Sequence, residues 1–362
     1  MMQRRYTVAV LLFAAILVPQ LSQAADDLPA KLSDSEFWQL ITGISEPNGR
    51  FQYENFVSNE FTLQSVIPSL KAQTKPAGAY IGVGPEQNFT YIAALHPKIA
   101  FIIDIRRQNL LEHLMYKAIF ELSRNRSDLV SLLFSRKRVS PLSVSSTAGE
   151  LLTAYSRVQG DRRLFDQNLR RIIHRLTIDH KFPLSDEDRN NIRYVYMTFF
   201  SHGPALDYTV GGFYTFDDPP TYIDLMTADD GQGRMRSFLA TEENFQTVKT
   251  LETENLLIPV VGDFAGSHAL REIGRFLAAH HSRVTAFYLS NVERYLFNAA
   301  DAWRNFYVNV AILPYDFDSF FIRSVFDASY GSASMLSRID DIMTAFSEGR
   351  LRTYTDVVHM SQ

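Results

Sequence analysis

Residues 79–109, AYIGVGPEQNFTYIAALHPKIAFIIDIRRQN, decide the fold of this chain. The stretch begins with a short apolar run, Ala79–Val83, and passes through a glycine-containing turn into a helical segment, Asn88–Leu95. A second apolar run, Lys98–Ile105, follows the His-Pro pair that ends this helix, and its near-continuous apolar character is typical of a strand buried on both faces. The order strand, turn, helix, strand predicts the first unit of a parallel α/β sheet.

The turn and the end of the second strand carry residues suited to a ligand-binding edge. Gly82 and Gly84 allow a tight turn and a close approach of the backbone to a ligand. Asp104 stands near the end of the second strand, where a carboxylate can accept hydrogen bonds from hydroxyl groups. Asn88 is the expected N-cap of the helix between them. These features are typical of a nucleotide-binding α/β domain.

Alternation of strands and helices returns in the last third of the chain. Sequence patterns predict strands at Leu256–Val261, Arg283–Ser290 and Ser319–Phe326, and helices at 241–254, 267–280, 292–310 and 334–346. Thr353–Val358 is expected to add a final edge strand. The fold class is therefore α/β, with a mostly parallel, Rossmann-like sheet flanked by helices.

A large helical insertion is expected after the second strand. Helical periodicity recurs from Gln108 to Thr198, and no strand pattern occurs between about residues 106 and 195. Residues 201–230 are rich in Gly, Pro, Asp and Tyr, which predicts a loop with short strands at Gly212–Thr215 and Thr221–Leu225. The insertion spans residues 125–240 of an α/β domain that covers residues 76–362.

The first 24 residues have the features of a secretory signal peptide. Two arginines precede an apolar run, Val8–Val18, and Ser22-Gln23-Ala24 supplies small residues for cleavage. The alternative is an uncleaved anchor helix, although this run is short for a bilayer span of about 20 residues. No comparable run occurs later, so we expect no membrane span after cleavage.

Residues 25–75 form the expected N-terminal helical segment. Ser33 and Glu36 have the spacing of a capping box, and a second helix is expected near Thr62–Leu70. Because these helices precede the first strand, they either cover a ligand cleft as a lid or pack on the edge of the sheet.

Composition excludes several classes of protein. The formal net charge is −4, and loss of the two arginines near the N-terminus makes it more negative, whereas nucleic-acid binders usually present a basic face. The chain has no cysteine, which excludes disulfides, thiolate metal sites and a cysteine nucleophile. With the leader, this composition favours an exported protein of the bacterial periplasm or cell envelope, with a small-molecule ligand and no nucleic acid as partner.

The order of these motifs resembles the class I, Rossmann-like, S-adenosylmethionine-dependent methyltransferases. Gly82-Val83-Gly84 resembles the glycine-rich first turn of that family, and Asp104 matches the acidic residue that holds the ribose hydroxyls. Gly262-Asp263-Phe264 resembles the segment near the adenine, and Ser290-Asn291-Val292-Glu293 the strand end where catalytic or substrate residues gather.

This resemblance implies S-adenosylmethionine as the cofactor. It implies cofactor contacts from Gly82, Gly84, Glu86, Asn88, Asp104, Arg106, Asp263 and Phe264, catalytic roles for Asn291 and Glu293, and no metal. Methyl transfer needs mainly the alignment of donor and acceptor, so no fixed catalytic triad is expected.

The sequence also departs from the family pattern. An acidic residue usually precedes the glycine turn, whereas this chain has Ala79-Tyr80-Ile81 there, and Glu86 is the candidate for that role. The turn lacks a third glycine, and the final antiparallel hairpin is expected to be reduced to one strand. We therefore expect a divergent branch of the family.

Export favours an alternative function, because the methyl donor is made in the cytosol. The alternative is a non-catalytic envelope protein, for binding or structure, that keeps only the fold. Arg107 and His113 either bind an anionic group above the strand ends or form salt bridges that organise the loop. No Gly-x-Ser-x-Gly or His-Glu-x-x-His motif supports a hydrolase or a zinc site.

Overall fold

The computed structural model describes residues 27–140, 142–211, 219–327 and 331–361. A six-stranded sheet with the order β3-β2-β1-β4-β5-β6 forms its centre. The strands are β1 (Ala79–Val83), β2 (Ile99–Asp104), β3 (Leu257–Val261), β4 (Val284–Ser290), β5 (Phe320–Asp327) and β6 (Gly331–Arg338). β1 to β5 pair in parallel, and β6 pairs antiparallel with β5. The predicted α/β fold with a mostly parallel sheet is confirmed.

Helices cover both faces of this sheet. They are α1 (Asp34–Ile44), α2 (Ile67–Gln73), α3 (Gln87–Leu95), α4 (Arg107–Leu122), α5 (Arg126–Leu133), α6 (Ala148–Ser156), α7 (Arg162–His174), α8 (Asp186–His202), α9 (Tyr222–Thr227), α10 (Glu242–Thr253), α11 (Ala269–Ala279), α12 (Val292–Phe297), α13 (Ala302–Val310), α14 (Ile339–Ser347) and α15 (Tyr354–His359). A π-helical turn, Arg175–Asp179, extends α7, and a 3₁₀ turn, Gly203–Ala205, follows α8.

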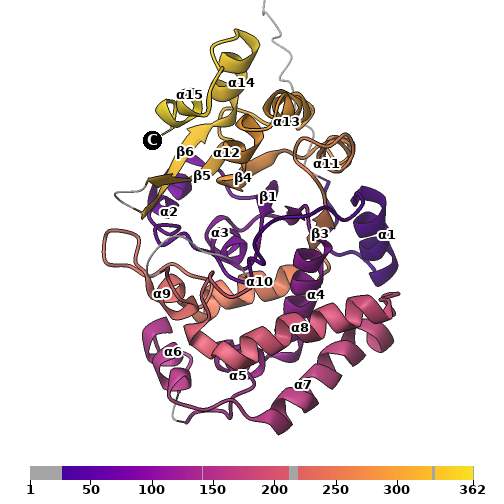
Figure 1. Ribbon diagram of the computed structural model, residues 1–362, viewed down its shortest axis with the longest axis vertical. Coiled ribbons are helices and arrows are strands. Elements are labelled where there is room, and N and C mark those ends of the chain that lie inside the picture. Colours follow the sequence, from indigo (N-terminus) through magenta and orange to yellow (C-terminus); the bar gives the residue numbers. More distant parts are fainter. Residues whose placement is uncertain (1–26, 141, 212–218, 328–330, 362) are drawn as a thin grey trace, which may run out of the picture.

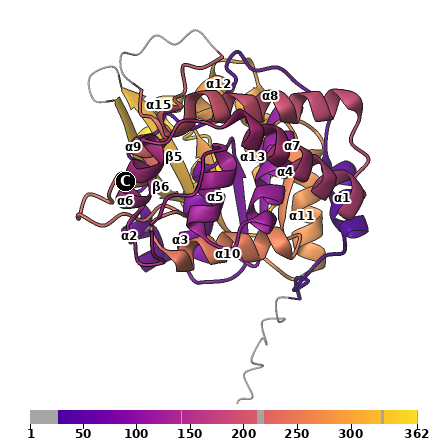
Figure 2. The ribbon, with the colours of Figure 1, turned by 90° about the horizontal axis from the view of Figure 1, so that it is seen from below.

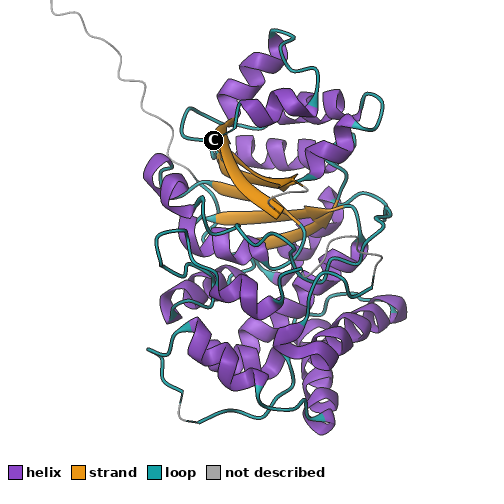
Figure 3. Ribbon diagram, turned by 60° about the vertical axis from the view of Figure 1, so that its left-hand side comes forward, coloured by secondary structure: helices purple, strands orange, loops and turns teal. Residues whose placement is uncertain are grey.

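These helices form layers. α3, α4 and α10 lie on one side of the sheet and α11 and α13 on the other (Figure 1). Figure 3 shows the strands as one layer between helices. α5, α7 and α8 form a further layer beyond α4, and Figure 2 shows them from outside. The helical insertion after the second strand is thus present, because α5 to α10 all precede β3.

Local sequence explains the elements nearest the ligand-binding edge. Every residue of β2 is buried, which agrees with its near-continuous apolar run. The Ser33 and Glu36 capping box is present at the start of α1. α1 packs beside β3 at the edge of the sheet, which was one of the two expected positions for the N-terminal segment.

Two predicted strands are helices instead. Thr221–Leu225 lies at the start of α9, and Thr353–Val358 lies at the start of α15. In both cases the threonine and an aspartate three residues later form a capping box, which satisfies backbone donors at a helix start. This Thr-x-x-Asp signal outweighs the β-propensity of the Thr-Tyr pairs.

Among the described residues one antiparallel strand ends the sheet, as expected, but it is β6 (Gly331–Arg338) and not the predicted Thr353–Val358. Residues Ser334–Arg338, predicted as the start of a helix, belong to β6, and α14 begins at Ile339. Eight residue pairs join β5 and β6, from Phe320↔Arg338 to Asp327↔Gly331. Pairing with a neighbouring strand therefore overrides the weak β-propensity of the small residues in β6.

The predicted signal peptide, residues 1–24, and the predicted strand at 212–215 lie outside the described residues. Within the described ranges, no helix is both long enough and apolar enough to cross a membrane.

Candidate ligand-binding cavity

A cavity of about 360 Å³ lies at the carboxyl ends of the central strands. The chain leaves β1 for β2 and β3 and then returns to β4 on the other side of β1, and such a reversal opens a crevice. The ends of four strands line the cavity with Val83 and Gly84, Ile103, Asp104 and Ile105, Gly262, Asp263 and Phe264, and Ser290, Asn291 and Val292. The structure thus brings together four segments that the sequence pattern selected.

Residues 45–59, the strap, provide the opposite wall. The strap crosses the strand ends, where the Glu46 amide donates to the Val261 carbonyl (2.8 Å) and the Gly49 amide to the Ile105 carbonyl (2.8 Å). Four rings on this side are in consecutive contact, with centroids 5.4 to 5.6 Å apart, and they belong to Tyr208, Tyr53, Phe51 and Tyr295. The N-terminal segment therefore covers the cleft as well as the sheet edge.

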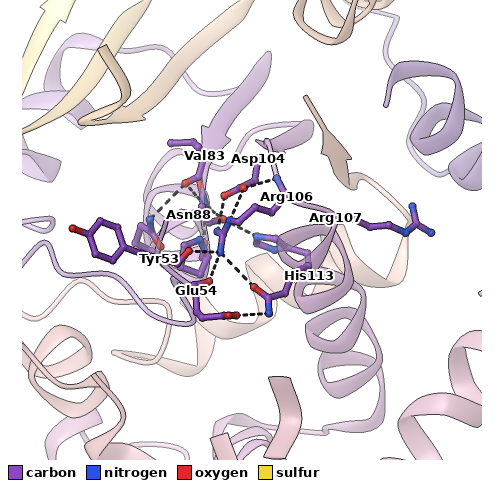
Figure 4. A network of polar contacts seen from close by, with 12 residues as sticks. Tyr53, Glu54, Val83, Asn88, Asp104, Arg106, Arg107 and His113 are labelled. Carbon is purple, nitrogen blue, oxygen red and sulfur yellow. Dashed lines mark hydrogen bonds and ion pairs between the residues drawn. The ribbon is translucent and has the colours of Figure 1, made fainter. Parts of the chain in front are cut away.

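The glycine turn is fixed by Asn88. Its Nδ2 donates to the carbonyls of Val83 (3.0 Å), Gly84 (3.1 Å) and Pro85 (2.7 Å), and its Oδ1 accepts from the Tyr80 hydroxyl (2.9 Å) (Figure 4). The expectation that Asn88 caps α3 is wrong, because the N-cap is Glu86 and makes no side-chain cap hydrogen bond. Asn88 supports the turn from behind, outside the described lining of the cavity.

The two glycines of the turn have different roles. Gly84 has φ +79° and lines the cavity, so it meets the expectation of a backbone conformation that favours glycine. Gly82 has no positive φ, but a Cβ there would lie 1.9 Å from the Asn88 Oδ1. Gly82 therefore makes room for the Asn88 side chain.

Asp104 lines the cavity, and Arg106 fixes the position of the Asp104 carboxylate. Arg106 donates from its backbone N (2.9 Å) and Nε (3.0 Å) to Asp104 Oδ1, and from Nη2 to Oδ2 (2.9 Å). Its Nη1 also donates to the strap carbonyls of Tyr53 (3.2 Å) and Glu54 (Figure 4). A carboxylate can accept about four hydrogen bonds, so Asp104 keeps capacity for a ligand.

Glu86 is buried behind the turn, outside the described lining of the cavity. Burial raises the pKa of its carboxyl to about 8, and burial also raises the pKa of the neighbouring Glu112. Glu86 therefore does not occupy the place of an acid beside the glycine turn.

Arg107 forms a salt bridge, which was one of the two alternatives, whereas His113 is a buried residue of the turn and takes neither role. Arg107 forms a bidentate ion pair with Asp188, at 2.6 and 2.9 Å, and points away from the network in Figure 4. His113 is buried, its Nε2 lies 2.9 Å from the Gly84 carbonyl oxygen, and burial lowers its pKa to about 4. A neutral His113 thus supports the same turn as Asn88.

Asp263 and Phe264 lie at the cavity where β3 ends. The Asp263 Oδ1 accepts from the Ala265 amide (2.9 Å), and the side chain remains partly exposed. The ring of Phe264 packs edge-on against Phe287 at 5.1 Å. Glu46 of the strap accepts from the amides of His268 and Ala269 (both 3.0 Å), so a carboxylate already occupies the amino end of α11.

The two predicted catalytic residues are separated. Asn291 lines the cavity, whereas Glu293 is 2% exposed and lies outside the described lining. Glu293 forms an ion pair with the fully buried Arg323 of β5 and accepts from the Tyr307 hydroxyl (2.6 Å). Arg323 within the apolar run of β5 is the sequence signal that could have indicated a buried partner for Glu293.

Sequence reasoning missed the aromatic wall of the cavity. No local sequence pattern places Tyr208 or Tyr295 beside the strap. Glu60, which bonds to Ser290 at the end of β4, was missed as well.

A family described as a domain of unknown function (DUF7790) matches residues 55–176 and 217–348. These two segments cover well over half of the chain and include all six strands, so the chain belongs to this family. No curated protein matches the chain.

Proposed function

We propose that this member of the DUF7790 family binds S-adenosylmethionine, or a related nucleoside, for methyl transfer to a small-molecule acceptor. The observation that carries the proposal is the cavity at the reversal of strand order. There, a glycine with positive φ follows β1, Asp104 ends β2, and Asp263 lies just after β3.

The residues present fit such a ligand in size and chemistry. A volume of about 360 Å³ lies in the range of small-molecule pockets, about 300–1,000 Å³. Gly84 leaves the backbone of the turn accessible where a larger residue would be strained. The bound nucleoside would supply a methyl group activated on sulfur.

The protein's own residues would bind and orient the ligand. Asp104, preorganised by Arg106, would accept from ribose hydroxyls, and Asp263 from an adenine amino group. Asn291 at the end of β4 would contact the acceptor. The strap would exclude water from the cavity, and the aligned groups would supply most of the catalysis.

Calorimetric titration of the full-length chain with S-adenosylmethionine and with S-adenosylhomocysteine tests this proposal. We expect binding in the micromolar range, weakened at least ten-fold by Asp263→Asn and unchanged by Asp341→Asn on the exposed face of α14. The absence of heat with either compound at millimolar concentration would overturn the proposal.

A second candidate is an exported envelope protein that retains the fold without catalysis. It is favoured by the placement of Glu293 in a buried ion pair and by the capture of both Asp104 oxygens by Arg106. Incubation with a methyl-labelled donor and an envelope extract separates the two candidates. Label transfer that Asp263→Asn abolishes would exclude this second candidate.

A further inference from the structure

Ser290 has a strained backbone at the end of β4. Its φ is +51°, a conformation that residues other than glycine rarely adopt. The register between β4 and β5 also shifts between Tyr288 and Ser290, which marks a bulge directly before the cavity. Strained residues and bulges of this kind gather at sites where a side chain must be aimed at a ligand.

The hydroxyl of Ser290 is bonded to a buried carboxyl. Ser290 Oγ donates to Oε1 of Glu60, which directly follows the strap and is only 1% exposed. The Tyr288 and Ser324 hydroxyls also lie close enough to the Glu60 carboxyl to favour its charged form, although Oε2 makes no hydrogen bond of normal geometry among the described residues. The preceding residue, Asn59, lines the cavity, whereas Glu60 does not belong to its described lining.

The groups around Glu60 are acidic or neutral. Tyr80, Tyr91, Tyr288 and Glu86 interact with its carboxyl electrostatically, and burial raises the pKa of each of these four side chains. Tyr354 also interacts with it electrostatically. Burial raises the pKa of Glu60 to about 7, and hydrogen bonding to hydroxyl groups, first that of Ser290, partly opposes this shift.

We propose that Ser290 and Glu60 form a proton-accepting pair for a ligand in the cavity whose reacting group is a hydroxyl, thiol or amine. Only the next step, transfer of a methyl group to the deprotonated hydroxyl, thiol or amine, rests on the proposed function. The proposal names the acceptor class, because such nucleophiles react only after deprotonation or with a base at hand.

The proton transfer balances without any further reagent. The ligand's O–H, S–H or N–H bond breaks, and its proton forms a new bond to Ser290 Oγ. The original Ser290 proton passes to Glu60 Oε1 along the existing hydrogen bond. Glu60 changes from carboxylate to neutral acid, and the electron pair stays on the ligand's nucleophilic atom.

The pair can be tested without knowledge of the natural acceptor. Phenylmethylsulfonyl fluoride reacts with a serine that has a base: a serine oxygen–sulfur bond forms, fluoride leaves, and the serine proton passes to the base. We expect Ser290 to be the serine that is labelled fastest, as located by peptide mass spectrometry. Its rate should rise with pH as Glu60 ionises, around pH 7.

Variants separate this role from a merely structural one. Glu60→Gln keeps an acceptor for the Ser290 hydroxyl, and we expect it to slow labelling at least ten-fold and to remove the pH dependence. Glu252→Gln is the matched control, because Glu252 is also buried with its pKa raised to about 8 but is not bonded to Ser290. Ser290→Gly should fold at least as stably as the parent protein, since glycine favours φ +51°, and should lose the label.

The two possible failures are distinguishable. No label on Ser290, or equal rates in Glu60→Gln and the parent, would overturn the proton-accepting pair. If calorimetry shows no nucleoside binding but Ser290 is still labelled as expected, the proposed function is overturned and the proton-accepting pair stands.

Discussion

The Arg106 guanidinium holds both carboxylate oxygens of Asp104 while it also donates to the backbone of the strap. The side chains of both residues are at most 8% exposed. One buried ion pair therefore fixes the carboxylate at the end of β2 and the segment that covers the cavity.

Arg106→Ala should lower the free energy of unfolding by about 3 kcal/mol, because it leaves the Asp104 charge buried without a partner. Arg107→Ala is the natural control, since the Arg107 side chain is 39% exposed and its loss should cost about 1 kcal/mol. Urea denaturation of both variants measures the difference. Equal losses would contradict a special role for Arg106.

Gly84→Ala should lower the free energy of unfolding by about 1–2 kcal/mol, because φ at this position is +79°. The Cβ would also approach Gln87 Nε2 to 3.1 Å. Gly43→Ala should instead raise stability by about 0.5–1 kcal/mol, because Gly43 lies in α1 with open space around it. Thermal unfolding of the two variants checks these opposite signs, and a neutral Gly84→Ala would show that the turn needs no glycine.

Glu293→Gln should destabilise the protein by about 3 kcal/mol, since it leaves the Arg323 guanidinium buried without its counter-charge. Asn291→Ala should change stability by less than about 1 kcal/mol and act on ligand binding instead. Denaturation and calorimetry on the same two variants test this separation. Loss of binding in a stably folded Glu293→Gln would restore Glu293 as a site residue.

Stability should fall between about pH 4.5 and pH 8, in part because of Glu86. Its pKa is raised from 4.5 in the unfolded chain to about 8 in the folded protein, with burial as the cause. Its contribution is therefore complete below pH 4.5 and is lost as pH rises toward the folded value, by up to about 1.4 kcal/mol per pH unit.

Glu86→Gln should reduce this slope, so that the variant loses less stability than the parent protein between pH 4.5 and pH 8; Glu60 and Glu252, whose pKa values are also raised, keep the rest of the slope. Glu243→Gln, at the exposed start of α10, serves as the control and should keep the slope. Urea unfolding at a series of pH values measures both, and an unchanged slope in Glu86→Gln would contradict the buried carboxyl.

The sequence predicted the sheet well because its signals are local. β2 is a continuous apolar run, and Ser33 and Glu36 cap α1 through contacts three residues apart. Thr221 and Asp224 carry the same kind of local signal, a capping box, which determines the helix α9 where the β-propensity of the segment predicts a strand. β6 could not be predicted from its own residues, because pairing with β5 determines its conformation.

The sequence predicted only those residues of the candidate site that lie at the ends of the parallel strands. Gly84, Asp104, Asp263 and Asn291 follow their strands and meet at one edge because the strands are parallel. Side chains such as Asn88, Glu86 and Glu293 follow the same strands but turn into the core, where tertiary partners hold them. The partners of Glu86 and Glu293, Ser58 and Arg323, are distant in the sequence, so spacing alone could not reveal them, whereas Asn88 bonds to neighbours in its own turn.

A crystal structure of the full-length protein with S-adenosylhomocysteine tests the central claim most directly. We predict electron density for the nucleoside between the strap and the strand ends, with the ribose at Asp104 and the base near Asp263. A cavity without density at saturating ligand, or density bound elsewhere on the protein, would contradict the claim.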